Sequence, residues 1–169
     1  NEYINVDERE INNIDIIADA RSLPFEDNCI DEIYASHLIE HFTKNELEKV
    51  VLPSWYKKLK NGGVIRVILP DLESMIKHYK ENNYNINDLR EVLYGLQEYP
   101  GDIHYALYGQ SELKGIFDNL GMNAEYTGKL RVSPKGSYEE YIKMIKEEVV
   151  GQIPLEFILA VSISGMLVD

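Results

Sequence analysis

The sequence has little cysteine and little positive charge for its length. Cys29 is the single cysteine among 169 residues, so no internal disulfide can form and the disulfide-rich secreted scaffolds are excluded. Lysine and arginine together number 17 against 29 acidic residues, which gives a net charge of −12. Most of such a surface repels a phosphate backbone, so we expect no nucleic-acid partner.

Targeting signals and long apolar runs are also missing. The first ten residues contain no basic region followed by an apolar run, so they are not a signal peptide. The most apolar stretch, Leu155 to Val168, contains polar interruptions and is shorter than the roughly 20 residues of a membrane span. It is open to three interpretations: a buried strand, a tail packed on a partner, or the start of a truncated element. We expect a cytoplasmic protein without a membrane span.

The composition is that of one globular domain. Apolar residues make up 44% and charged residues 27% of the chain, which is enough for a buried core and a soluble surface. We predict an α/β domain over residues 1–132. Residues 133–169 are expected to add a helix and an apolar strand or tail to that same domain.

Strand and helix patterns alternate along the chain. Alternating β-formers or apolar runs predict strands at Tyr3–Asp7, Asp15–Ala18, Ile30–Ser36, Val64–Leu69 and Asn123–Val132. Capping residues and apolar stripes predict helices from Thr43 to before Asn61, over Leu72–Glu81, around Leu89–Tyr94, from about Ser111 to Gly121, and over Tyr138–Val150. This alternation predicts a Rossmann-like fold, with a mostly parallel sheet and helices on both faces.

Two acidic residues follow predicted strands. Asp7 ends the first strand and Asp19 follows the second. Ligands of open α/β sheets bind beyond the carboxyl ends of the strands, where a carboxylate can accept hydrogen bonds from ribose hydroxyls or an adenine amino group. Taken singly, Asp7 is better explained as a surface acid that caps a turn and Asp19 as an ordinary exit from a strand into a turn.

Five segments together resemble successive motifs of class I S-adenosylmethionine-dependent methyltransferases. More narrowly, they resemble small methyltransferases associated with surface-glycan synthesis. The segments are YINVD from Tyr3, ADARSLPF from Ala18, DEIYASHLIEHF from Asp31, LKNGGVIRVILPDL from Leu59 and YGLQEYPGDIH from Tyr94.

The resemblance implies S-adenosylmethionine as cofactor and assigns residues to it. Asp7 would hold the ribose, Asp19 and Ala20 would bind the adenine with Arg21 beside them, and Ser36 with His37 would line the floor near the sulfonium. The resemblance also implies a first strand and a glycine-rich loop just before Tyr3. No G-x-G occurs in the chain, which begins at Asn1, so we expect that segment to have been processed or left out.

Several residues are candidates for the acceptor side. His104 ends a loop rich in glycine, proline and tyrosine and could act as a general base. Asp71 follows the strand ending at Leu69, where it is also explained as a helix cap. The tyrosines of the loop region suggest a sugar-stacking surface, or simple amphipathic packing, at Tyr94, Tyr99, Tyr105 and Tyr108.

The segment His37-Leu38-Ile39-Glu40-His41 has the formal pattern H-x-x-E-H of some zinc proteases. It follows a predicted strand directly and a new helix cap begins at Thr43, so no full ligand-bearing helix can develop. We therefore predict no metal site and place His37 and His41 at the acceptor.

Two functions remain open from the sequence. The first is methyl transfer to a small-molecule or glycan acceptor, with His37, His41, Asp71 and His104 as catalytic candidates. The second is a non-catalytic Rossmann-like remnant that serves as an interaction or scaffold module, for which a homodimer is an expectation.

Overall fold

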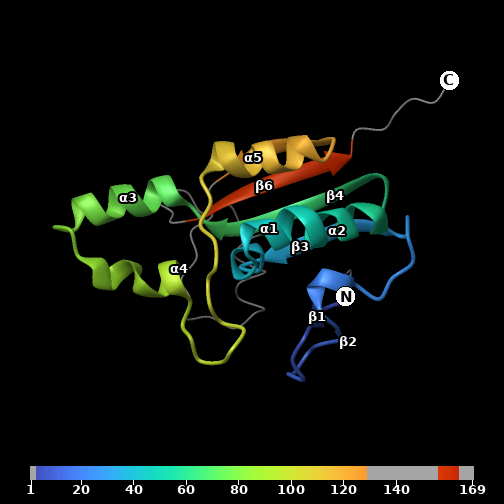
Figure 1. Cartoon of the computed structure of the whole chain (residues 1–169), viewed down its shortest axis with the longest axis horizontal. Coiled ribbons are helices and arrows are strands. Elements are labelled where there is room, and N and C mark those ends of the chain that lie inside the picture. The colour runs from blue at the N-terminus through green and yellow to red at the C-terminus, as the bar shows by residue number, and fades with distance from the viewer. Residues whose placement is uncertain (1–2, 129–155, 164–169) are drawn as a thin grey trace.

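The structure is a computed structural model that describes residues 3–128 and 156–163 (Figure 1). Strands and helices alternate along the chain. In order they are β1 (Val6–Asp7), β2 (Ile16–Ile17), the 3-10 helix η1 (Ala20–Ser22), β3 (Ile30–Ser36), the 3-10 helix η2 (Ile39–His41), α1 (Lys44–Glu46), the π-helical turn η3 (Leu47–Val51), α2 (Leu52–Lys58), β4 (Leu59–Pro70), α3 (Leu72–Glu81), the 3-10 helix η4 (Ile86–Leu89), α4 (Arg90–Tyr94), α5 (Gln110–Asn119), β5 (Met122–Gly128) and β6 (Glu156–Ile163).

The main sheet has four strands in the order β3-β4-β6-β5. Strands β3 and β4 are parallel, whereas β6 runs antiparallel to both β4 and β5. The apolar stretch near the C-terminus therefore supplies an inner strand, which is the first of the three interpretations that its sequence left open. The predicted α/β Rossmann-like fold is confirmed, with a sheet that mixes parallel and antiparallel pairs.

Helices α2 and α5 cover one face of this sheet (Figure 1). Alternate residues of β4 (Ile65, Val67 and Leu69) belong to the same buried cluster as the apolar residues of the two helices, because side chains of a strand alternate between faces. The opposite face carries Arg66, which lies 3.6 Å from Glu32 on β3. This explains the single charge within the otherwise apolar run Val64–Leu69.

A capping box begins the helical segment from α1 to α2, as its sequence predicts. The Thr43 hydroxyl accepts a hydrogen bond from the Glu46 N–H, and the Thr43 N–H donates to the Glu46 carboxylate at 3.0 Å. Between α1 and α2 the helix widens into a π turn, in which the Leu52 N–H donates to the Leu47 carbonyl. Pro53 follows directly, and the wider turn relieves the crowding that its ring causes in a regular helix.

Strand β4 is longer than predicted because it begins at Leu59, before the Asn61-Gly62-Gly63 turn. Its register with β3 shifts there, from Ile30 opposite Leu59 to Glu32 opposite Val64. Gly62 has a φ of 78°, a value that favours glycine. The predicted turn is therefore present as an irregularity inside the strand.

Strands β1 and β2 form a separate parallel sheet of two strands. Both are shorter than predicted. Among the residues that the structure describes, neither strand pairs with β3, and β3 pairs only with β4. Trp55 of α2 connects η1, which follows β2, to the core, because its indole N–H donates to the Ala20 carbonyl at 2.8 Å.

The predicted helix at Leu72–Glu81 has the predicted bounds, and the next two helices, α4 and α5, lie within one or two residues of their predicted positions. The predicted helix at 138–150 and the predicted domain boundary at 132 lie outside the described residues. Within the described part of the chain, no helix combines the length and the apolar character needed to cross a membrane.

The Trp55 contact yields a stability prediction. Trp55→Ala is expected to lower the free energy of unfolding by about 3–5 kcal/mol through loss of buried volume. Trp55→Phe keeps most of the packing and should cost about 1 kcal/mol for the lost hydrogen bond. Urea unfolding followed by far-ultraviolet circular dichroism is the measurement, since Trp55 is the one tryptophan of the chain.

Val50→Ala is the control for this series, because Val50 is exposed on the same helical segment. It should change the unfolding free energy by less than about 0.5 kcal/mol. Equal effects of Trp55→Phe and Trp55→Ala would contradict a packing role for the indole ring.

Candidate functional site

Asp7, the predicted ribose ligand, is already bound to an arginine. Its Oδ1 accepts hydrogen bonds from the backbone N–H and Nε of Arg9 at 2.8 and 2.9 Å, and its Oδ2 accepts one from Arg9 Nη2 at 2.9 Å. The hydrogen bond with Arg9 lowers the pKa of Asp7, so the carboxylate is ionised near neutral pH. Three of its roughly four acceptor positions are in use in this arrangement.

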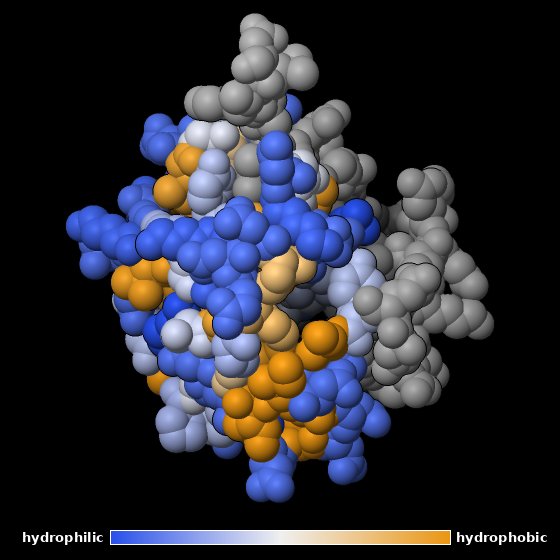
Figure 2. Space-filling view, turned by 90° about the vertical axis from the view of Figure 1, so that its right-hand side faces the viewer, coloured by the Kyte–Doolittle hydropathy of each residue, from blue (hydrophilic) through white to orange (hydrophobic). Residues whose placement is uncertain are grey.

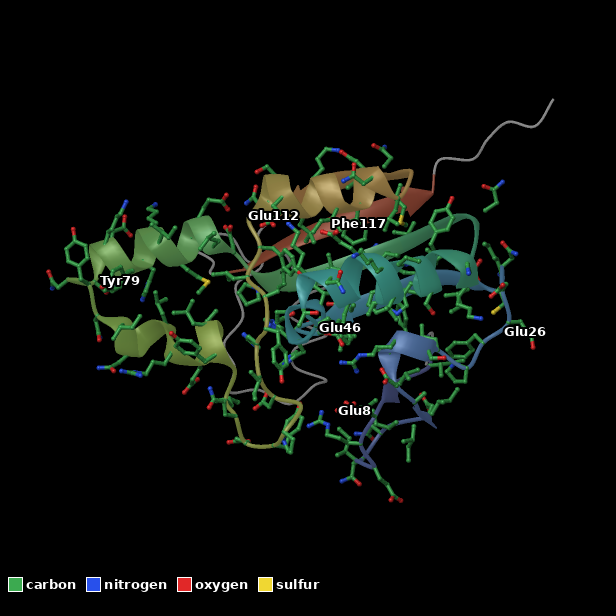
Figure 3. The ribbon with its side chains drawn as sticks, viewed as in Figure 1. Glu8, Glu26, Glu46, Tyr79, Glu112 and Phe117 are labelled. Carbon is green, nitrogen blue, oxygen red and sulfur yellow. The ribbon has the colours of Figure 1, made fainter. Side chains whose placement is uncertain are left out.

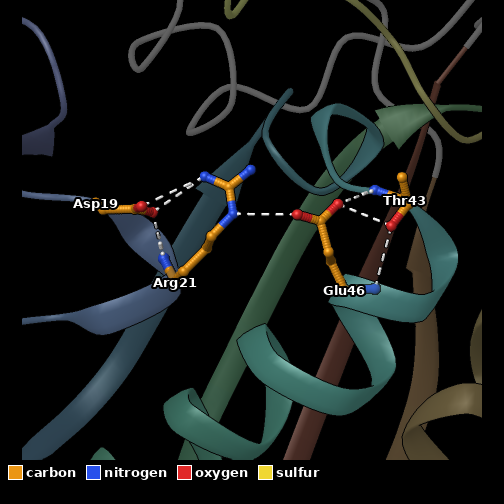
Figure 4. A network of polar contacts seen from close by, with 4 residues as sticks. All are labelled: Asp19, Arg21, Thr43 and Glu46. Atoms are coloured by element: carbon orange, nitrogen blue, oxygen red, sulfur yellow. Dashed lines mark hydrogen bonds and ion pairs between the residues drawn. The ribbon is translucent and has the colours of Figure 1, made fainter.

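Asp19 and Arg21, predicted to lie at the adenine, form a network with α1 (Figure 4). Asp19 accepts the Arg21 backbone N–H at 2.8 Å and so caps η1. The Arg21 guanidinium lies 3.3 Å from Asp19 and 3.5 Å from Glu46 of the capping box, and stacks 4.8 Å from the centre of the Phe42 ring. Arg21 thus connects the segment after β2 to the start of α1.

Asp7 and Asp19 both lie at the carboxyl ends of the strands of the small sheet. Strands β1 and β2 are parallel, with Val6 opposite Ile16 and Asp7 opposite Ile17. The Ala18 N–H donates to the Asp7 carbonyl at 2.9 Å, so the pairing continues to the residue before Asp19. The two carboxylates therefore follow adjacent parallel strand ends, as the sequence predicts.

Ser36 and His37 lie at the carboxyl end of β3. Ser36 is the last residue of the strand, opposite Ile68 of β4, and the His37 N–H donates to the Ile68 carbonyl at 2.9 Å. His37 has a φ of 48°, which is uncommon for a residue with a side chain. Its Nδ1 lies 3.3 Å from Oε1 of Glu40, and only 1% of the Glu40 side chain is exposed.

His41 and His104 come together from distant parts of the sequence. Their rings pack edge to face with centroids 4.7 Å apart. His41 Nδ1 lies 3.2 Å from the Ile103 carbonyl, and His104 Nδ1 lies 2.8 Å from the Val92 carbonyl. The backbone carbonyl of Glu40 accepts the N–H groups of Tyr105 and Ala106 at 2.8 and 3.2 Å, which attaches the segment containing His104 to η2.

The loop at residues 95–109 connects α4 to α5 and reaches back to β1 (Figure 1). The Arg9 guanidinium lies 4.3 Å from the centre of the Tyr99 ring. A Cβ added to Gly101 would lie 2.8 Å from Oε1 of Glu8, which Figure 3 shows between β1 and this loop. The loop thus spans from the Asp7–Arg9 pair to the His41–His104 pair.

The predicted tyrosine surface is only partly present. Tyr94 and Tyr105 are exposed by 53% and 58%, but Tyr108 is buried at 1%. Burial raises the pKa of the Tyr108 hydroxyl above its ordinary value, so this tyrosine belongs to the core. Of the two alternatives that the sequence left open, packing is therefore the one found for Tyr108.

Asp71 is fully buried at the start of α3, and its side chain makes no capping hydrogen bond to the helix backbone. Its Oδ2 instead accepts the Ser74 hydroxyl at 2.5 Å. Asp71 also shares a hydrogen bond with Glu73, and this contact is the main reason that the pKa of Glu73 is raised. The contacts of Asp71 with Ser74 and Glu73 therefore take the place of the helix cap that the sequence suggests.

Glu40 is the residue that the sequence prediction missed as a member of the site. The H-x-x-E-H pattern drew attention to His37 and His41 as a pair on one helix. In the structure His37 follows a strand and Glu40 and His41 lie in the 3-10 helix η2, so the two histidines do not share a helix face. The glutamate of the H-x-x-E-H pattern was the available sequence signal, whereas its burial is visible only in the structure.

Two shallow hollows lie away from the predicted cofactor and catalytic residues. They have volumes of about 330 and 320 Å³ and are lined by residues around Tyr56 and Lys57 and by residues around Arg90 and Tyr94. The second therefore includes one of the predicted stacking tyrosines. Figure 2 shows another hollow at the centre of one face, with hydrophobic side chains below it at the level of β1 and β2. Ile4, Ile11 and Ile17 are exposed in this part of the chain.

A family model described as a methyltransferase domain matches residues 2–67, which is less than half of the chain. The matched range contains Asp7, Asp19 and the segment His37–His41. A comparison with curated proteins gives no match. The family match therefore places the similarity to a methyltransferase domain over the N-terminal part of the chain.

Solved methyltransferase structures share the fold. A SAM-dependent methyltransferase from Archaeoglobus fulgidus superposes with a TM-score of 0.55 at 19% identity, covering 94% of this chain and 75% of that one. Similar proteins from Thermotoga maritima and Methanosarcina mazei also give 0.55, at 16% and 14% identity. They match 89% and 88% of this chain, which spans 65% and 66% of theirs.

The Asp71–Glu73 pair yields a pH-dependent prediction. Because the folded-state pKa of Glu73 is raised, its contribution to stability is complete below the unfolded value of about 4.3 and is lost as the pH rises through the folded value. Glu73→Gln keeps a hydrogen-bond donor without a charge, so it should raise the melting temperature at pH 7.5 and leave it unchanged at pH 4.

Glu98→Gln, on the exposed loop, is the matched control for removal of one negative charge. Thermal unfolding of both variants at the two pH values is the measurement. An equal shift in the two variants would show that net charge, rather than the pair with Asp71, governs the effect.

Proposed function

We propose that this protein transfers a methyl group from S-adenosylmethionine to an oxygen of a small-molecule or glycan acceptor. The observation that carries the proposal is the placement of Asp7 and Asp19 after adjacent parallel strands, within the range that matches the methyltransferase domain. Two carboxylates at neighbouring strand ends suit the hydroxyl and amino donors of a nucleoside.

The cofactor supplies an electrophilic methyl group bound to a sulfonium sulfur. Transfer of this group is an in-line displacement with a good leaving group, so positioning accounts for much of the acceleration. Asp7 would accept hydrogen bonds from the ribose and Asp19 one from the adenine, with Ala20 and Arg21 beside it and Ser36 near the methionyl part.

The two acids fit this role after their arginines move. The side chains of Asp7 and Asp19 are 23% and 49% exposed, so a ligand can reach them. The Asp19–Arg21 pair is exposed and contributes at most about 1 kcal/mol, so opening it costs little. The Asp7–Arg9 pair is part-buried and bidentate, so its replacement by two ribose hydroxyls costs more. The geometry is compatible with a bound nucleoside. In the structure, however, the carboxylates of Asp7 and Asp19 are bound by Arg9 and Arg21 of the same chain.

The acceptor would lie near the histidine cluster. A histidine that takes the proton of an acceptor hydroxyl makes the oxygen a better nucleophile. His37, His41 and His104 are candidates for this role, whereas the contacts of Asp71 with Ser74 and Glu73 favour a structural role. The exposed rings of Tyr94 and Tyr105, on α4 and the adjoining loop, suit stacking against a sugar.

The occupied carboxylates also favour the second candidate function, a non-catalytic interaction module. In that case Arg9 and Arg21 would hold Asp7 and Asp19 permanently. A measurement of cofactor affinity distinguishes the two functions directly.

Titration calorimetry with S-adenosylmethionine tests the proposal. Asp7→Asn and Asp19→Asn should each weaken binding by about 10-fold or more, equivalent to roughly 1.4 kcal/mol. Arg9→Ala should strengthen binding, because it frees the Asp7 oxygens. Asp31→Asn is the matched control, since Asp31 is an exposed acid that pairs with Lys60 on the main sheet.

Unchanged affinity in both Asp7→Asn and Asp19→Asn would remove these residues from the cofactor site. No binding by the unaltered chain at millimolar cofactor would support the interaction module instead.

A further inference from the structure

Glu40, His41 and His104 form a compact group of metal-binding donors. One donor atom from each of the three side chains lies within 4.8 Å of the other two. The donors come from two segments, η2 and the loop at 95–109, which are held together by hydrogen bonds from Tyr105 and Ala106 to the Glu40 carbonyl. The backbone therefore fixes the relative position of the two segments without any ion.

The hydrogen bonds of the two imidazoles leave one nitrogen of each ring available. A backbone carbonyl only accepts hydrogen bonds, so Nδ1 of His41 must donate to Ile103 and Nδ1 of His104 must donate to Val92. In a neutral imidazole Nε2 then carries a lone pair. A ring oriented through Nδ1–H and a carbonyl is the usual support for a metal-binding histidine.

Glu40 supplies the second, independent observation. Its side chain is 1% exposed, and neither carboxylate oxygen accepts a hydrogen bond from the described residues. A buried carboxylate without donors is costly unless a cation compensates its charge. His37 lies 3.3 Å from Oε1 and can compensate only when it is protonated.

We propose that Glu40, His41 and His104 bind a divalent transition-metal ion of the zinc class. Two imidazole nitrogens and one carboxylate oxygen are a donor set found in zinc sites that keep a position open for a further ligand. Donor atoms around a tetrahedral zinc lie about 3.3 Å apart when the bonds are about 2.05 Å long. Side-chain rotations that move the donor atoms by roughly 1 Å therefore complete the site. His37 then supports the Glu40 carboxylate from outside the coordination shell.

The open position gives the ion a role in the reaction. An acceptor hydroxyl bound there loses its proton to solvent water more readily. The oxygen lone pair then forms the C–O bond to the methyl group while the C–S bond of the cofactor breaks, and the electron pair of that C–S bond stays on sulfur. This role rests on the proposed function, whereas binding of the ion does not depend on it.

The test is zinc titration of chelator-treated protein, without S-adenosylmethionine, by calorimetry. One equivalent of Zn²⁺ should bind to the unaltered chain and raise its melting temperature. Glu40→Gln and His104→Ala should each weaken binding by about 100-fold, because even supporting residues of metal sites contribute 10- to 100-fold. His37→Ala should weaken it less.

His78→Ala is the matched control, because His78 lies on α3 and contacts Asn82 rather than the cluster. It should leave zinc affinity unchanged. Co²⁺ provides a second readout, since the intense visible absorption of a tetrahedral cobalt site should appear with the unaltered chain and be lost in Glu40→Gln.

Equal zinc affinity of Glu40→Gln, His104→Ala and the unaltered chain would overturn the proposal. So would loss of binding in His78→Ala alone. Melting curves recorded with chelator show whether each variant is folded. A cofactor titration with chelator present reports on the proposed function separately, so the failure of one proposal is distinguishable from the failure of the other.

Discussion

The parallel pairing of β3 with β4 is the constraint on which the candidate site depends. It brings the carboxyl ends of both strands to one edge of the sheet, and the His37 N–H extends the ladder by donating to the Ile68 carbonyl. The chain then turns sharply through a residue with positive φ and enters η2. The positions of Glu40 and His41 follow from the point at which this turn leaves the sheet.

A second constraint connects this edge to the long loop. The Glu40 carbonyl accepts two N–H groups from residues that are more than 60 positions away in the sequence. As a result His104 packs against His41, and the buried carboxylate of Glu40 lies beside both rings. Because burying that carboxylate is costly, a cation bound at this position stabilises the structure.

Electrostatics organises the cofactor side differently. In a chain with a net charge of −12, Asp7 and Asp19 are each paired with an arginine two residues later in the sequence. Such local pairs form with little rearrangement of the chain, and the exposed Asp19–Arg21 pair opens at low cost. The two arginine–aspartate pairs that stabilise the turns after β1 and β2 therefore compete with any ligand that binds these carboxylates.

The sequence by itself determined the local elements. The Thr43–Glu46 capping box, the strand at Ile30–Ser36 and the helix at Leu72–Glu81 are encoded by short-range patterns, and each is found where it is predicted. Asp7 and Asp19 are likewise predicted from the sequence, because each comes at or directly after the end of a predicted strand. These features depend on neighbours within a few residues, for which propensity and periodicity are informative.

Only the tertiary structure decided the rest. The inner position of β6 requires pairing with β4, about 90 residues earlier in the sequence. The contact of His41 with His104 and the inward turn of Tyr108 require a loop to fold back over η2 and α5. Glu40 is one acid among 29 in the sequence. Its significance comes from burial without hydrogen-bond donors, and burial is a property of how distant segments pack rather than of local sequence.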